Sequence, residues 1–200
     1  YSYRQKKRQE FICVCDNCIH GIFRAGIRAG NLLFSTKARP STLVYDGFHK
    51  MVLAEPELEE LAKKRRSDIY IEESNTFVKP IAFNAKKSDG FNPQLVVCDE
   101  MAAWSGDAGL KQYEVMKSAL GARTQPMILS ISTAGYINDS IYDELMKRST
   151  SFLKGNSKEC RLLPFLYMID DVEKWNDIDE LKKANPNMGV SVKEVSLWTR

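Results

Sequence analysis

Four consecutive apolar residues, Leu95 to Cys98, run directly into the acidic pair Asp99 and Glu100. A short, continuous apolar run of this kind is expected of a strand that is buried on both faces in a parallel sheet. Ligands in such sheets bind at the carboxyl ends of the strands, which is where this strand would deliver its two carboxylates. This one segment therefore predicts both a type of sheet and the edge at which a site would lie.

Strand and helix patterns alternate along the rest of the chain. We predict helices over residues 43–54, 57–66, 109–120 and 139–148, and strands over residues 69–71, 77–83, 95–98, 127–132 and 162–169. The strand over 127–132 should be buried, whereas Pro164 would place the strand over 162–169 at an edge. Such alternation predicts an α/β fold with a mostly parallel, three-layer sheet.

Composition sets broad limits on the class of protein. Two hundred residues, 44% of them hydrophobic and 28% charged, suit one substantial globular α/β domain. The net charge of +3 is too small to indicate nucleic acid by itself, and the basic run over residues 63–66 is more typical of a solvated face. No apolar run reaches the roughly 18 residues of a membrane span. Five cysteines, an odd number, favour a reducing cytoplasm.

The acidic pair suggests nucleotide chemistry. Asp99 could hold Mg²⁺, directly or through water, near the β- and γ-phosphates of a nucleotide, and Glu100 could polarise or deprotonate the attacking water. Taken alone, the same pattern is more often a strand that ends in a solvated acidic turn.

A second strand ends in small polar residues. The strand over 127–132 runs into Thr133, Ala134 and Gly135, where a hydroxyl could lie close to a terminal phosphate and Gly135 permits a sharp exit. By itself this is an ordinary strand-to-loop turn. Its weight comes from following the Asp-Glu strand after one helix and about thirty residues.

In this order the sequence resembles the large terminase subunit of tailed bacteriophages, in its HK97-like branch. The resemblance covers about residues 43–192. It is carried by Asp89-Gly90-Phe91-Asn92-Pro93, Leu95 to Glu100 with Trp104, Gly121-Ala122-Arg123-Thr124-Gln125-Pro126, Ser132 to Tyr136, and Lys183-Ala184-Asn185-Pro186-Asn187.

The resemblance implies a P-loop NTPase-like motor that hydrolyses ATP with Mg²⁺ and drives double-stranded DNA into a procapsid. In the family's terms Asp99 and Glu100 are the Walker B pair, and Thr133, Ala134 and Gly135 couple hydrolysis to movement. Arg123 would stabilise transition-state charge in its own subunit or a neighbour, or serve as a surface or phosphate-backbone contact.

The resemblance also implies partners and a location. These are a terminase small subunit, a portal protein and a homo-oligomeric ring, in the cytoplasm of a bacterial host that carries a phage or prophage. The chain opens on Tyr1, which suggests a fragment. Residues 43–170 would form the ATPase core, and residues 171–200 a linker toward a nuclease domain that lies beyond the chain.

One departure from the family is serious. A phosphate loop needs glycines followed by Lys and then Ser or Thr, and none of Gly21, Gly26 and Gly30 is followed by such a pair. When the reading frame is shifted forward by one nucleotide, the codons allowed for residues 5–11 can encode Arg-Lys-Asn-Gly-Lys-Ser, a phosphate loop typical of the family. Those allowed for residues 30–41 can encode Glu-Ile-Tyr-Phe-Ser-Ala-Pro-Lys-Arg-Asp-Gln-Ala, which also resembles the family. We therefore hypothesise that residues 1–42 are translated out of frame and do not belong to the fold.

Alternative readings stay open at this point. The chain is also compatible with a non-catalytic prophage remnant that retains the fold, or with a helicase-like P-loop NTPase. Cys13, Cys15, Cys18 and His20 resemble a metal cluster that would make the chain a zinc-binding interaction module. Zinc sites, however, usually pair their ligands with a second pair well downstream.

Overall fold

The computed structural model describes residues 31–36, 42–72, 74–81, 83–84, 90–135, 139–190 and 193. The chain divides into two compact units. The sheet unit comprises the described residues of Phe11–Arg148, and the C-terminal unit comprises those from Ser149 onward. The zinc-like cluster and the codons of the hypothesised phosphate loop fall on residues outside the described ranges.

The sheet unit contains a six-stranded sheet, counted over the described residues, in the order β2-β3-β4-β1-β5-β6. The strands are β1 (Asn31–Thr36), β2 (Ala62–Lys64), β3 (Ile69–Ile71), β4 (Thr76–Ile81), β5 (Pro93–Asp99) and β6 (Met127–Ser130). β4, β1, β5 and β6 are parallel to one another, while β2 and β3 add an antiparallel edge. The predicted mostly parallel α/β sheet is confirmed.

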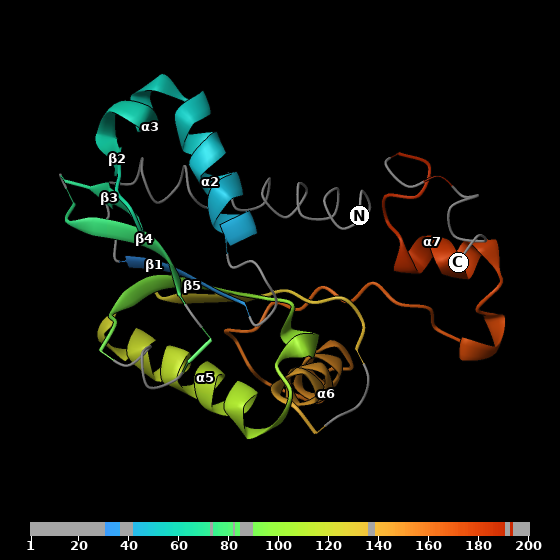
Figure 1. Cartoon of the computed structure of the whole chain (residues 1–200). Helices are drawn as coiled ribbons and strands as arrows, with labels where there is room; N and C mark the ends of the chain where they lie inside the picture. Colours follow the sequence, from blue (N-terminus) through green and yellow to red (C-terminus); the bar gives the residue numbers. More distant parts are fainter. Residues whose placement is uncertain are drawn as a thin grey trace. The chain divides into compact units, whose positions relative to one another are not determined.

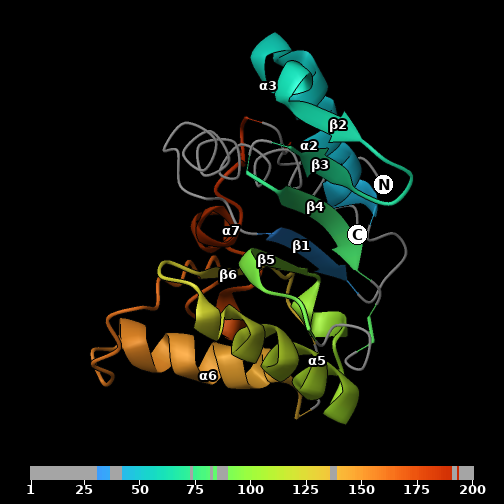
Figure 2. The same ribbon diagram turned by 90° about the vertical axis from the view of Figure 1, so that its left-hand side faces the viewer.

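Helices cover both faces of this sheet, which gives three layers (Figures 1 and 2). Helix α2 (Thr42–Ala54) packs on one face, and α5 (Gly106–Ala119) with the first turns of α6 (Ile141–Leu153) pack on the other. Along β5, Leu95 and Val97 face the α2 side, whereas Val96 and Cys98 face the α5 side. This explains the continuous apolar run, because successive side chains of a strand point to opposite faces and both faces are covered.

Strand β1 lies inside the segment 1–42 that we expected to be outside the fold. It pairs in parallel with β4 and β5, and Leu32 is in register with Val78 on one side and Leu95 on the other. Residues 31–36 therefore belong to the sheet, and the expectation does not hold for them.

The predicted helix over 57–66 is too long. Helix α3 (Pro56–Leu61) ends where Ala62–Lys64 pair in antiparallel fashion with β3. Lys63 forms an ion pair with Glu72, and the Arg65 guanidinium lies 3.6 Å from the centre of the Tyr70 ring. The basic run therefore forms a solvated sheet edge, and charged side chains of this kind discourage pairing with another chain.

Two predicted strands differ from the structure. β6 is not buried as expected: it lies at the edge of the described sheet, and Met127 is 43% exposed. Residues 162–169 form no strand, although half-buried and exposed side chains nearly alternate along them. The C-terminal unit instead adds a 3-10 turn, η3 (Val172–Lys174), and helix α7 (Ile178–Ala184). None of the helices described has the length and apolar character needed to cross a bilayer.

Candidate functional site

The ends of β5 and β6 are joined beyond the regular ladder. The Ile131 amide donates to the Cys98 carbonyl at 2.9 Å, and the Met101 amide donates to the Ile131 carbonyl at 3.0 Å. These two bonds bring the segment after β6 alongside Asp99 and Glu100. The two polar strand ends predicted from sequence are therefore neighbours at the carboxyl edge of the sheet.

Asp99 is the last residue of β5, and it is only 8% exposed. Its carbonyl accepts a hydrogen bond of 3.1 Å from the indole Nε1 of Trp104. Trp104 is fully buried and packs edge-on against Phe83, with 5.0 Å between ring centroids. The backbone that carries the Asp99 carboxylate is thus anchored into the core beneath it.

Glu100 follows in the left-handed region, with φ 55° and ψ 48°. This conformation is uncommon for a residue with a side chain. It ends the strand abruptly and starts the 3-10 turn η1 (Met101–Ala103). The two carboxylates therefore leave the backbone from residues in different conformations.

The segment after β6 folds over that turn. The Ser132 hydroxyl accepts from the Ala102 amide at 2.9 Å and donates to the Thr133 carbonyl at 2.8 Å. A Cβ added at Gly135 would lie 2.6 Å from the Ala102 Cβ, so this close approach requires glycine. Thr133 and Ala134, between these two contacts, are exposed.

The oxygen ligands of this edge suit Mg²⁺ bound together with a phosphate. Mg²⁺ is usually held by one or two protein carboxylates, with waters and substrate phosphates filling its octahedral shell. Within the described ranges no group of three or more His, Cys, Asp or Glu side chains could hold a metal ion by itself. The Asp99 carboxylate could serve as the single protein ligand of such a phosphate-dependent site. Cys98, the residue before Asp99, contributes only packing. Burial raises the pKa of its thiol to about 12, so the thiol stays protonated and is a poor metal ligand.

Arg123 lies at the other end of β5. Its Nε and Nη2 donate to the Asn92 carbonyl at 3.2 and 2.7 Å, directly before the strand begins. Asp99 ends the same strand, six residues after Pro93, so roughly 20 Å separates the two ends at a strand rise of about 3.3 Å per residue. Arg123 is therefore not brought to the carboxylates of its own subunit. A contribution to a neighbouring subunit remains a prediction.

That opposite edge explains two of the sequence motifs used above. The Asn92 carbonyl is held by Arg123, and the Gln94 side-chain amide donates to the Gln125 carbonyl. Residues 92–94 and 123–125, which lie in or next to these motifs, are thus fastened to each other at the amino end of β5. Their role in this structure is to brace the strand that carries the acidic pair.

A cavity of about 220 Å³ lies between the first turns of α5 and α6. Its lining includes four carboxylates, those of Asp107, Asp139, Asp143 and Glu144, together with Lys147. The Asp143 carboxylate accepts from the Ser140 amide and hydroxyl at 3.0 and 3.2 Å, so it caps α6. The cavity includes neither Asp99 nor Thr133, and its carboxylates disfavour a triphosphate.

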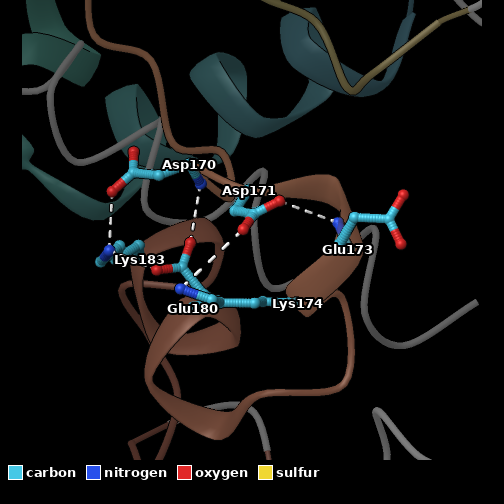
Figure 3. Close-up of polar contacts among 6 residues, drawn as sticks. All are labelled: Asp170, Asp171, Glu173, Lys174, Glu180 and Lys183. Atoms are coloured by element: carbon cyan, nitrogen blue, oxygen red, sulfur yellow. Dashed lines mark hydrogen bonds and ion pairs between the residues drawn. The ribbon is translucent and has the colours of Figure 1, made fainter.

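The C-terminal unit has its own polar cluster (Figure 3). The Glu180 carboxylate accepts from the Asp170 amide at 2.7 Å, and Lys183 donates to Asp170 and Glu180 at 2.6 and 2.5 Å. The hydrogen bond from Lys183 lowers the pKa of Glu180. Asp177 caps α7 through the Asp179 amide. These contacts fasten the chain at Asp170 to helix α7. They also give a structural role to Lys183, the first residue of the motif 183–187.

Two residues were missed as site residues in the sequence. Ser132 and Trp104 stand inside the motifs that carry the resemblance, but nothing in their spacing assigned them a role. The contacts that give them one join Ser132 to a residue thirty positions away, and Trp104 to the backbone of Asp99. An indole five residues after a strand end was the one available signal.

Comparison with known proteins agrees with this fold. The sequence model of the terminase large subunit ATPase domain matches residues 20–151. Protein YmfN of Escherichia coli strain K12 is 37% identical over 108 residues, which are 54% of this chain and 23% of YmfN. The crystal structure of the HK97 bacteriophage large terminase is similar with a TM-score of 0.66 at 18% identity. That match covers 89% of this chain and 36% of the terminase, and it shows a shared fold. The chain thus spans well under half of each relative.

Proposed function

Because this chain belongs to the family of terminase large subunit ATPase domains, we propose that it forms the ATP-hydrolysing core of a motor that packages viral DNA. The observation that carries the proposal is the meeting of two strand ends. Asp99 and Glu100 end β5 beside the segment of residues 131–135, on the carboxyl edge of a parallel sheet. Ligands of three-layer α/β folds bind at that edge.

Each carboxylate has a distinct task in this proposal. Asp99, at the tip of the strand, holds Mg²⁺ directly or through water. Bound Mg²⁺ neutralises charge on the phosphate oxygens. Glu100 orients the attacking water and takes its proton, which is a contribution typically worth about 10² to 10⁴ in rate. Thr133, Ala134 and Gly135 sense the terminal phosphate and pass its loss to the rest of the motor.

The partners follow from the family. Double-stranded DNA is the transported substrate, while a terminase small subunit and a portal protein complete the machine. We propose that the subunits act as a homo-oligomeric ring in the bacterial host. DNA translocation needs the whole terminase, of which this chain corresponds to the nucleotide-hydrolysing part.

A second candidate is a non-catalytic remnant of such a domain. It is favoured by one observation, since no Gly-Lys-Ser or Gly-Lys-Thr string occurs in the 200 residues. Without backbone amides and a lysine to cradle the phosphates, nucleotide should bind poorly. An out-of-frame start at the phosphate loop would account for this loss, and sequencing the coding DNA over residues 5–11 tests it directly.

The central experiment compares nucleotide binding by this chain with binding by a version whose first 30 codons are shifted into the neighbouring frame, so that β1 keeps its sequence. We expect the shifted version to bind and hydrolyse Mg·ATP, and the present chain to bind weakly or not at all. In the shifted version, Glu100→Gln should reduce hydrolysis by at least about 100-fold while leaving binding intact. Absence of binding in both versions would contradict the ATPase proposal.

A further inference from the structure

The backbone around Glu100 is held in a conformation that it would not adopt freely. At φ 55° and ψ 48° Glu100 occupies the left-handed region, where the Cβ of an L-residue crowds its carbonyl. Residues persist in such conformations where the surrounding structure imposes them. The groups that impose this one therefore control where the Glu100 carboxylate lies.

One group acts from the core side. The Trp104 indole donates to the Asp99 carbonyl at 3.1 Å, and the indole is fully buried. A Cβ added at Gly109 would lie 2.2 Å from the Trp104 carbonyl oxygen, so α5 packs directly against the backbone of this tryptophan. The residue before Glu100 is thus fixed to the interior.

The second group acts from the neighbouring strand. The Ile131 carbonyl and the Ser132 hydroxyl accept from the amides of Met101 and Ala102, the two residues that follow Glu100. The Ile131 contact uses backbone atoms, which any residue supplies. The Ser132 contact needs a hydroxyl, and that hydroxyl also donates to the Thr133 carbonyl.

Ser132 therefore joins two parts of the site that are thirty residues apart in sequence. We propose that Ser132 is a positioning residue, whose hydroxyl holds the turn Met101–Ala103 so that Glu100 keeps its left-handed conformation. A shift of the segment from Thr133 to Gly135 is passed through this hydroxyl to the Glu100 carboxylate. The catalytic part of this inference rests on the proposed function, whereas the geometric part does not.

The test uses the isotope-labelled 200-residue chain without nucleotide. A residue with positive φ gives a strong nuclear Overhauser effect between its own amide and α protons, because the two protons are close together. We expect Ser132→Ala to weaken this signal at Glu100 and to speed exchange of the Ala102 amide by roughly fivefold to tenfold, as loss of one hydrogen bond would. Ser132→Thr, which retains the hydroxyl, should restore both signals.

Ser130→Ala is the matched control, because Ser130 is an exposed serine at the end of β6. It should leave both signals at their original values. The proposal is overturned if Ser132→Ala leaves the Glu100 signal and the Ala102 exchange unchanged, if Ser130→Ala alters them equally, or if Ser132→Thr fails to restore them. Because no nucleotide is present, these results are independent of the ATPase proposal, which the binding comparison above decides separately.

Discussion

At the scale of single residues, the turn that carries Glu100 depends on close backbone contacts that only glycine permits at two positions. The turn after β5 packs so closely on α5 and on the segment after β6 that Gly109 and Gly135 face atoms a Cβ would overlap. The two glycines thus allow backbones to approach, although neither has a positive φ. Both positions can be tested by adding one methyl group.

Gly109→Ala should destabilise the sheet unit by about 1–3 kcal/mol, which is the usual cost of overpacking a core. The reason is that the added Cβ would lie 2.2 Å from a backbone oxygen of Trp104, which cannot rotate away. Urea denaturation followed by circular dichroism measures the change. Gly121→Ala is the control, since nothing lies within 4 Å of its added Cβ. Equal midpoints for the two variants would contradict the packing described here.

At the scale of elements, β5 is braced at both ends by different partners. Its carboxyl end is held by Trp104 and by the segment after β6, and its amino end by Arg123. The arginine expected to stabilise charge in the reaction therefore supports the strand that carries the carboxylates. In the C-terminal unit, α7 is fastened in a comparable way by an ion-paired cluster.

Arg123→Ala should lower the free energy of unfolding of the sheet unit by about 1 kcal/mol, because two hydrogen bonds to the Asn92 carbonyl are lost at a partly exposed site. We expect no loss of hydrolysis by a monomer of the frame-shifted version. Denaturant unfolding and steady-state hydrolysis measure the two effects. Lys111→Ala, which removes an exposed cation from α5, controls for charge. A monomer that loses hydrolysis with Arg123→Ala would place the arginine in its own active site.

The cluster on α7 should weaken in acid. The hydrogen bond from Lys183 lowers the pKa of Glu180 from its ordinary value of 4.5, so the ionised carboxylate is favoured in the folded unit. A carboxyl group whose pKa is lower in the folded state stabilises that state at pH values above its ordinary pKa. This stabilisation is lost as the pH falls from the ordinary pKa through the lowered pKa. The pKa of Lys183 is raised by its hydrogen bonds to Asp170 and Glu180, so its contribution persists through neutral pH and is lost only in strong base.

The Asp170 amide, which donates to Glu180, reports this titration in NMR spectra recorded from pH 7 to pH 2. We expect the chemical shift of this amide to change below pH 4.5. Glu180→Gln retains an acceptor oxygen but cannot ionise, so the change should disappear in that variant. An amide that titrates identically in both proteins would assign the transition to another carboxyl group.

At the scale of the whole molecule, β6 has a composition that does not match its position. Met-Ile-Leu-Ser is typical of an interior strand, yet β6 is an edge strand of the described sheet, and Met127 is 43% exposed. An exposed apolar edge strand invites pairing with another strand. A further parallel strand beside β6 would remove both the exposure and the unpaired edge.

We expect the version with its first 30 codons in the neighbouring frame to supply that strand. Amides along the outer edge of β6 should then exchange at least about tenfold more slowly than in the present chain, because each would gain a hydrogen bond. Hydrogen exchange read by mass spectrometry compares the two proteins, with peptides from β3 as the internal control. Unchanged exchange along β6 would show that the shifted segment does not complete the sheet.

The sequence by itself determined the parallel sheet, its covering helices and the strand that ends in Asp99 and Glu100. It could do so because burial on two faces leaves a continuous apolar run, and one-sided burial leaves a helical period, both of which are local patterns. Only the tertiary structure decided that α3 ends at Leu61 and that β6 is exposed. It also decided that Arg123 lies at the opposite end of β5 from Asp99 and Glu100. It also joined Ser132 to the turn after Glu100. Each of these depends on contacts between residues far apart in the chain, which no local periodicity records.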